Sequence, residues 1–286
     1  MKPTIRLGID IGSTTIKYVV LNAKNEILAS QYQIHHTQYL PLLKTIFTDL
    51  LRQFGDIKIS LSITGSAGMG VCERFNLPFV QEVIAETECV KQFFPHCNTI
   101  MDVGGEDAKM VFLSDTAIPE MRMSGNCSGG TGAFLDQMAV LLGCSTEELS
   151  NLAEKSTRIY PMASRCGVFS KTDVQNLSAK HIPKEDIAAS VFHAVVVQIV
   201  GGLSKGMKIK PPILLSGGPF QFLPALKNAL LIYLNLEEKD IICSENANLL
   251  TAFGAALKSN ELHQDFSIQS VINLLNNQNN YRHLNM

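Results

Sequence analysis

The stretch that decides the fold of this 286-residue chain is Met101-Asp-Val-Gly-Gly-Glu-Asp-Ala-Lys109, followed by Ser124-Gly-Asn-Cys-Ser-Gly-Gly-Thr-Gly-Ala-Phe-Leu-Asp136. Its first part leaves an apolar strand, residues 99–103, and enters two glycines and two acidic residues. Glycine lets backbone N–H groups approach a phosphate, and carboxylates can hold a hydrated cation. The first part therefore predicts a turn that binds phosphate.

The second part places Cys127 in a glycine-rich loop ahead of a predicted helix. The apolar residues that follow at helical spacing are Phe134, Leu135, Met138, Leu141 and Leu142. We expect the cysteine to lie beside the helix N-terminus, where partial positive charge favours a thiolate. A thiolate in that position can bind a metal or attack a substrate.

The same pattern occurs near the start of the chain. Asp10-Ile-Gly-Ser-Thr-Thr-Ile-Lys17 has an acid at a strand end, a turn rich in hydroxyls and a lysine on the next strand, which suits phosphate and Mg²⁺. Alone this motif is weak, because a strand, a glycine turn and a strand often form a simple hairpin. Asp102 to Lys109 repeats it, and Ser216-Gly-Gly-Pro219 follows a third apolar strand. We expect the three turns to converge on one nucleotide.

The predicted elements also repeat. Each half opens with three short strands and a glycine turn after the first; the ranges are 5–11, 16–21 and 26–33, then 99–103, 108–113 and 117–123. Predicted helices follow each set, and residues 163–173 read as a loop. The chain becomes rich in Asn and Gln after Lys258, which predicts a mobile tail.

Composition excludes several classes of function. Lys and Arg number 24 against 26 Asp and Glu, and they are scattered, so there is no electrostatic footprint for nucleic acid or an anionic membrane. We find no apolar signal core before Ile5 and no apolar run of the roughly 18 residues that a spanning helix needs. We therefore expect a cytoplasmic protein that binds small molecules or other proteins.

The seven cysteines are widely spaced and odd in number, so we expect reduced thiols rather than a disulfide framework. Five are interpreted as small buried hydrophobes: Cys72, Cys89, Cys97, Cys144 and Cys243. Cys127 and Cys166 differ because glycine and polar residues surround them. Unpaired structural thiols or a simple zinc half-site are the alternatives for this pair.

The glycine turns resemble those of the actin, sugar-kinase and heat-shock-chaperone ATPase superfamily, and the resemblance covers residues 4–258. The cysteine segments Cys127-Ser-Gly-Gly-Thr-Gly132 and Cys166-Gly-Val-Phe169 resemble those of the activator ATPases of 2-hydroxyacyl-CoA dehydratases. That group includes ATPase subunits of benzoyl-CoA reductases. Glu106 stands where the short dehydratase activators usually have Gln. In this respect the chain is more similar to the long fused activases.

The resemblance implies an α/β fold of two duplicated ribonuclease-H-like, or actin-like ATPase, domains with a nucleotide cleft between them. The first domain is expected over residues 1–96. The second, over 97–258, would carry the cluster cysteines, and 259–286 would form a polar tail.

The resemblance also implies roles for the motif residues. Asp10 and Asp102 would organise Mg²⁺ and water, and Glu106, or alternatively Asp107, would orient the attacking water. The residues expected to bind ATP or ADP are Gly12, Ser13, Thr14, Thr15, Lys17, Gly104, Gly105, Gly217, Gly218 and Asn248.

Cys127 and Cys166 are the implied metal ligands. A four-iron four-sulfur cluster takes four thiolates, so a twofold homodimer would supply the full set. The implied activity is ATP-coupled transfer of a low-potential electron, from reduced ferredoxin or flavodoxin to a dehydratase- or reductase-type partner enzyme. Two rival interpretations are a small-molecule kinase, which leaves both cysteine loops idle, and a non-catalytic nucleotide-dependent sensor without iron.

Overall fold

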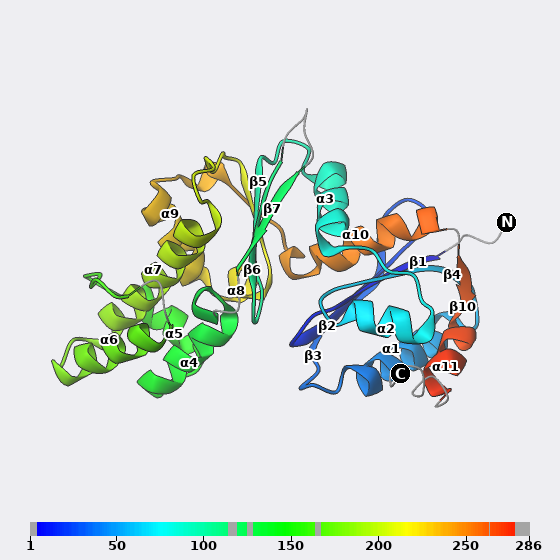
Figure 1. Cartoon of the computed structure of the whole chain (residues 1–286), viewed down its shortest axis with the longest axis horizontal. Coiled ribbons are helices and arrows are strands. Elements are labelled where there is room, and N and C mark those ends of the chain that lie inside the picture. Colours follow the sequence, from blue (N-terminus) through cyan, green and yellow to red (C-terminus); the bar gives the residue numbers. More distant parts are fainter. Residues whose placement is uncertain (1–4, 114–118, 125–127, 164–166, 263, 278–286) are drawn as a thin grey trace, which may run out of the picture. The chain divides into compact units, whose positions relative to one another are not determined.

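A computed structural model describes residues 5–113, 119–124, 128–163, 167–262 and 264–277 (Figure 1). The chain divides into two compact units. Unit 1 contains Met1–Pro95 and Leu249–Met286, and unit 2 contains His96–Asn248. The chain thus returns to unit 1 at Leu249, whereas the second domain was expected to extend to residue 258.

Unit 1 is built on one mixed sheet with the strand order β10-β4-β1-β2-β3. Only β1 and β4 are parallel among its neighbours; the other pairs are antiparallel. Its elements are β1 (Ile5–Ile11), β2 (Thr15–Leu21), β3 (Ile27–Ile34), α1 (Tyr39–Phe54), β4 (Lys58–Thr64), α2 (Gly68–Phe75), α3 (Glu82–Phe93), α10 (Leu250–Lys258), β10 (Asp265–Ser267) and α11 (Ile268–Asn276).

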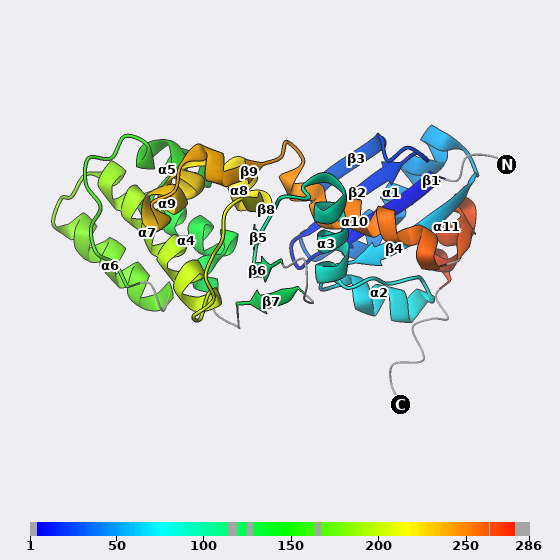
Figure 2. The ribbon, with the colours of Figure 1, turned by 90° about the horizontal axis from the view of Figure 1, so that it is seen from above.

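The helices of unit 1 cover both faces of the sheet. The apolar faces of α1, α2 and α11 form the main core with the inward residues of β1, β2 and β4. The helices α3 and α10 lie side by side on the opposite face (Figure 2). A Cβ on Gly8 would lie 2.0 Å from the Ala252 carbonyl oxygen, and one on Gly254 would lie 1.7 Å from that of Ala85. These glycines let α10 pack directly on β1 and α3, which is why residues 249–258 belong to unit 1.

The segment after Lys258 differs from the expected mobile tail. β10 pairs with β4, and α11 buries Ile268, Val271 and Leu275 in the unit 1 core. These three residues recur at helical spacing, so the helix has one apolar face despite its Asn- and Gln-rich surroundings. Residues 278–286 lie outside the described part of the chain.

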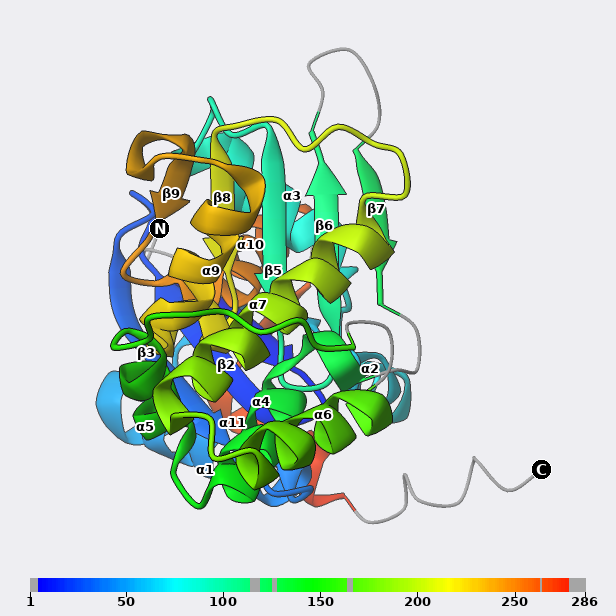
Figure 3. The same ribbon diagram turned by 90° about the vertical axis from the view of Figure 1, so that its left-hand side faces the viewer.

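Unit 2 has a sheet with the strand order β7-β6-β5-β8-β9, visible in Figure 3. Helices α4, α5, α7 and α9 supply its core together with the inward residues of β5, β6 and β8. Its elements are β5 (Thr99–Val103), β6 (Ala108–Phe112), β7 (Glu120–Met123), α4 (Gly132–Leu142), α5 (Thr146–Ala153), α6 (Gly167–Ala179), α7 (Lys184–Leu203), β8 (Ile213–Ser216), α8 (Gly218–Phe222), α9 (Pro224–Leu234) and β9 (Ile241–Cys243).

Two helices of unit 2 differ from expectation. α7 is long and apolar enough to cross a membrane by length and composition, contrary to the expectation that no such run exists, but it is mostly buried as a core helix. α6 (Gly167–Ala179) includes residues 167–173, which were expected to form a loop. Its first turns are held by Ser170, whose hydroxyl donates to the Ala163 carbonyl, and by Asp173, which accepts from the Ala163 N–H.

The predicted duplication is confirmed in the strand registers. Asp10 pairs with Lys17 across β1 and β2 and with Thr64 across β1 and β4. In unit 2, Asp102 pairs in the same way with Lys109 and with Ser216. Each unit therefore presents one aspartate at the same position of the same strand arrangement, as an α/β fold made of two duplicated actin-like ATPase domains requires.

Candidate functional site

The first aspartate turn is built around Asp10, which is 1% exposed at the end of β1. Its Oδ2 atom accepts a hydrogen bond of 2.9 Å from Lys17 Nζ and one of 2.6 Å from Thr251 Oγ1. A buried carboxylate needs such partners because desolvation disfavours its charged form. Lys17 and Thr251 therefore hold the carboxylate in one orientation.

The turn that follows Asp10 is closed by a 2.9 Å hydrogen bond from the Gly12 N–H to the Thr15 carbonyl. Ser13 is exposed at the tip and Thr14 is half-buried, so both are accessible to a ligand, whereas Thr15 is buried. The expected phosphate residues are thus brought together on one tight turn, with Thr15 on its inner side.

The second aspartate turn repeats this geometry in unit 2. The Gly104 N–H donates to the Asp107 carbonyl at 2.8 Å, and Asp102 is 9% exposed at the end of β5. Lys109 Nζ lies 3.9 Å from Asp102 Oδ2 and 3.2 Å from Asp107 Oδ2, so the lysine is shared between the two carboxylates. Glu106 is exposed on the same turn, where water can reach it.

A glycine with positive φ faces each aspartate from the neighbouring parallel strand. Gly65 has φ +100°, and a Cβ there would lie 2.5 Å from Asp10 Oδ1. Gly217 has φ +90°, and a Cβ there would lie 2.7 Å from Asp102 Oδ1. Both positions require glycine for its backbone conformation and for the close approach. The equivalence of Gly65 and Gly217 extends the duplication to the carboxylates themselves.

The Ser216-Gly-Gly-Pro219 turn joins the second aspartate turn to a later segment. Ser216 Oγ and the Gly217 N–H both donate to the Ala247 carbonyl, each at 3.1 Å. Gly218 begins α8, and half-buried Asn248 follows Ala247 directly. The three expected adenosine residues, Gly217, Gly218 and Asn248, are therefore neighbours in the fold.

The second turn is also hydrogen-bonded to the helix that follows the Cys127 loop. The N–H groups of Gly132 and Ala133, the first residues of α4, donate to the carbonyls of Gly104 and Gly105 at 2.9 and 2.8 Å. These two N–H groups have no acceptor within a helix's own first turn. The aspartate turn thus caps α4.

The expected cluster ligands, Cys127 and Cys166, lie outside the described residues. The segments next to them approach each other, because a Cβ on Gly167 would lie 4.0 Å from Gly129 Cα and 3.4 Å from the Phe134 ring. Within the part of the chain that the structure describes, no group of three or more His, Cys, Asp or Glu residues could hold a metal ion.

The remaining cysteines fit the buried-hydrophobe interpretation only in part. Cys72, Cys89 and Cys97 are buried, and burial raises the pKa of Cys72 and of Cys89 to about 12, with a smaller contribution from Glu73 and Glu86, respectively. Cys144 is half-buried, and Cys243 is exposed at the end of the edge strand β9. The interpretation is therefore wrong for Cys243.

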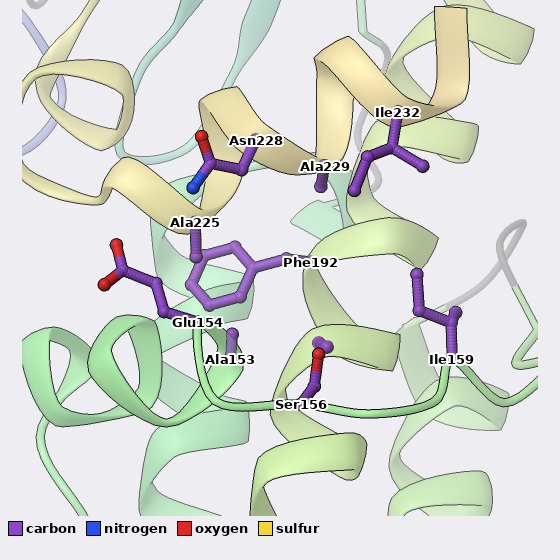
Figure 4. Close-up of a pocket in the computed structure, with 10 residues that line it drawn as sticks. Ala153, Glu154, Ser156, Ile159, Phe192, Ala225, Asn228, Ala229 and Ile232 are labelled. Atoms are coloured by element: carbon purple, nitrogen blue, oxygen red, sulfur yellow. The ribbon is translucent and has the colours of Figure 1, made fainter. Parts of the chain in front are cut away.

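A small pocket elsewhere in unit 2 has no part in this site. It lies between α5, α7 and α9 and is lined mainly by alanine, isoleucine and Phe192 (Figure 4). Its volume is about 70 Å³. Ligand pockets usually measure about 300–1,000 Å³, so a nucleotide does not fit here.

Sequence reasoning missed Gly65 and Thr251 as partners of Asp10. The positive φ of Gly65 is signalled only weakly, by a glycine directly after a buried strand. Thr251 lies 241 residues from Asp10, and no local pattern marks it.

The chain is similar to known proteins over most of its length. The chain matches the BadF/BadG/BcrA/BcrD ATPase family over residues 7–259. It is 29% identical to the activator of lactoyl-CoA dehydratase from Anaerotignum propionicum, over 90% of this chain and 98% of the relative.

Two solved structures are similar. Component A of (R)-2-hydroxyglutaryl-CoA dehydratase from Acidaminococcus fermentans has a TM-score of 0.80 and 27% identity, and the match covers 91% of this chain and all of that one. The activator of 2-hydroxyisocaproyl-CoA dehydratase from Clostridium difficile, with bound ADPNP, has a TM-score of 0.76 and 26% identity, over 91% and 95% of the two chains.

Proposed function

The chain belongs to the BadF/BadG/BcrA/BcrD ATPase family, and we propose that it is an iron–sulfur activator that couples ATP hydrolysis to electron delivery. The family match and the relatives, which include activators of dehydratases, support an ATPase of the activator type. The proposed acceptor is a partner enzyme of the 2-hydroxyacyl-CoA dehydratase or benzoyl-CoA reductase type. Reduced ferredoxin or flavodoxin is the proposed donor, and the proposed location is the cytoplasm.

The observation that carries the proposal is the hydrogen bonding of the second aspartate turn to α4. Gly104 and Gly105 belong to the turn expected to bind phosphate, and Gly132 and Ala133 begin the helix that follows Cys127. A displacement of the turn when phosphate binds or leaves would act on α4 directly through two backbone hydrogen bonds. A kinase that uses only the nucleotide turns would have no function for these two hydrogen bonds.

Each residue of the site has a proposed role in hydrolysis. Asp10 and Asp102 hold Mg²⁺ and its water ligands, which suits carboxylates at two strand ends. Ser13, Thr14 and Lys17 bind phosphate oxygens. Glu106 orients the attacking water from its exposed position on the second turn, with Asp107 as the alternative. Gly217, Gly218 and Asn248 lie beside the adenosine. Bound Mg²⁺ would supply charge neutralisation at the phosphates.

The two cysteine loops have a separate proposed role. Cys127 and Cys166 from each of two copies bind one four-iron four-sulfur cluster, which would supply a low-potential electron. The close approach of Gly129 and Gly167 supports this pairing of the loops. Because one chain offers two suitable thiolates and the cluster needs four, the proposed active form is a homodimer.

The test is anaerobic purification followed by iron and sulfide analysis, electron paramagnetic resonance and sedimentation, alongside an ATPase assay. We expect a dimer with about four irons and Mg²⁺-dependent hydrolysis. A full cluster in a monomer would contradict the shared site. Protein that binds no iron but phosphorylates a small molecule would favour the kinase. ATP binding with neither iron nor turnover would favour the sensor.

A further inference from the structure

His35 is hydrogen-bonded to the first aspartate turn through both its backbone and its side chain. It follows β3 directly and is 5% exposed. Its backbone N–H donates to the Thr14 carbonyl at 3.0 Å, and its ring Nε2 lies 3.1 Å from the Gly12 carbonyl oxygen. Its Nδ1 atom accepts the Thr37 N–H at 3.0 Å, and the Tyr39 ring packs edge-on against the imidazole.

These contacts determine where the ring carries its proton. A backbone N–H can only donate, so Nδ1 must be the unprotonated acceptor of the Thr37 N–H. The single proton of a neutral imidazole then sits on Nε2. Nε2 therefore donates to the Gly12 carbonyl, and the bond to the turn depends on this tautomer.

The equivalent carbonyl in unit 2 is held in the same way by a different group. Gly104 occupies the position of Gly12, since both follow the aspartate by two residues and both donate to the carbonyl three residues later. The Gly104 carbonyl accepts the Gly132 N–H at 2.9 Å. In the first turn a side chain donates, and in the second a helix N-terminus donates. Both turns have a donor to this one carbonyl.

The carbonyl matters because of the peptide that it belongs to. The Gly12 C=O and the Ser13 N–H are parts of one planar trans peptide, so they point in opposite directions. While His35 holds the carbonyl, the Ser13 N–H points away from the His35 ring, and Ser13 itself is exposed at the tip of the turn. Without that bond, glycine's freedom about ψ would let the peptide rotate and turn the N–H away.

We propose that His35 is a positioning residue for nucleotide binding, which aims the Ser13 N–H at a phosphate oxygen by donating from Nε2 to the Gly12 carbonyl. The proposal rests on the proposed function, because it takes the first turn as a phosphate site. His35 itself touches no phosphate in this arrangement. It affects the affinity for nucleotide by orienting the peptide group between Gly12 and Ser13.

Two substitutions test the donor atom Nε2 and the acceptor atom Nδ1 of His35 separately. In His35→Gln, the side-chain amide can place an N–H where Nε2 was. In His35→Asn, the amide oxygen can replace Nδ1 as acceptor for the Thr37 N–H, but nothing reaches the Gly12 carbonyl. The control is His36→Asn, because His36 is the exposed neighbour at φ +45°, a conformation that asparagine tolerates.

The readouts are the dissociation constant of Mg·ATP and the separate kcat and KM of hydrolysis. We expect His35→Asn to raise the dissociation constant and KM about tenfold with kcat changed much less, the effect of one hydrogen bond to a charged ligand. His35→Gln and His36→Asn should stay close to wild type. If His35 had only a structural role, both variants would have a lower folded fraction, and the dissociation constant of Mg·ATP would not differ between them.

A second measurement uses the wild-type protein and does not depend on any variant folding. Nitrogen-15 NMR of the histidine side chains should identify His35 as the Nε2–H tautomer, and its signals should shift on addition of ATP. The Nδ1–H tautomer, or equal ATP affinity in the Asn and Gln variants, would overturn the proposal. Wild-type protein that binds no ATP would overturn the proposed function as well, whereas ATP binding unaffected by His35→Asn would overturn this inference alone.

Discussion

The N–H of Gly132 donates to the carbonyl of Gly104 at 2.9 Å, which joins the first residue of α4 to the second aspartate turn. The adjacent bond from Ala133 to Gly105 has a length of 2.8 Å. Together they connect a turn expected to bind phosphate with the helix that follows Cys127.

ATP should slow amide hydrogen exchange at Gly132 and Ala133, because a phosphate bound at the second turn would restrain their acceptors. The measurement is hydrogen exchange by mass spectrometry with and without Mg·ATP. The start of α9 is the matched control, since its Ala225 N–H donates to Ser150 Oγ and to neither turn. Equal changes in α4 and α9, or none in α4, would argue against the connection.

Asp10→Asn should preserve the fold and lower Mg²⁺-dependent ATP hydrolysis by at least about 100-fold, because it removes a carboxylate charge with little change in volume. Lys17 would then face a neutral amide. Asp49→Asn is the control, since that side chain is 57% exposed on α1. Steady-state hydrolysis as a function of Mg²⁺ concentration is the measurement. Hydrolysis at the wild-type rate would place the site elsewhere.

Cys127→Ala and Cys166→Ala should each abolish the cluster, because one substitution removes two of the four ligands in a symmetric dimer. ATP affinity should survive, since other residues form the phosphate turns. Visible absorption, iron content and the ATP dissociation constant are measured for each variant. Cys243→Ala is the control, because Cys243 is an exposed thiol on β9. A cluster that persists in either of the first two variants would sink the electron-transfer assignment.

Gly217→Ala should lower the free energy of unfolding by about 2–4 kcal/mol, from the positive φ and from overpacking. A Cβ there would lie 2.0 Å from the Val103 carbonyl oxygen as well as 2.7 Å from Asp102 Oδ1. Gly70→Ala, in an exposed position of α2 with open space around it, should change the same quantity by no more than about 1 kcal/mol. Denaturant titration measures both. Comparable values for the two variants would refute the close approach.

The buried thiols of Cys72 and Cys89 should make unit 1 less stable at alkaline pH. Burial raises each pKa from the ordinary value of 9.0, which we expect in the unfolded chain, to about 12. Below pH 9 both states keep the proton, and between pH 9 and 12 only the unfolded chain releases it. Stability should therefore fall as pH rises through this window, by about 1.4 kcal/mol per pH unit for each thiol. Denaturant titrations of wild type and Cys89→Ala at several pH values measure the slope, which should be shallower in the variant.

Local sequence patterns were sufficient for the two strand-and-turn repeats. Asp10 to Lys17 and Asp102 to Lys109 are short stretches, and each carries its own signals: alternating or buried apolar residues, a glycine after an acid, and a lysine at a fixed spacing. Strand registers follow from such spacing because the side-chain period of a strand is two. The aspartate–lysine pairs were therefore predictable without tertiary information.

Other parts of the fold depended on packing. The helix α11 and its strand β10 were not expected in a polar segment, because Ile268, Val271 and Leu275 become a core face only when the sheet of unit 1 is present to cover them. The return of the chain to unit 1 at Leu249 depends on Gly8 and Gly254, whose missing side chains admit α10.

The sequence by itself thus predicted the acidic, glycine and lysine residues of each turn as candidate site residues, while the tertiary structure decided what holds them. Thr251 donates to Asp10 from 241 positions away, and His35 reaches Gly12 from the end of β3. Contacts of this kind arise where two segments are packed together by the core, and no local propensity encodes them. For the same reason, Gly217 could be read as a turn glycine from its neighbours, but its approach to Asp102 required the parallel pairing of β5 and β8.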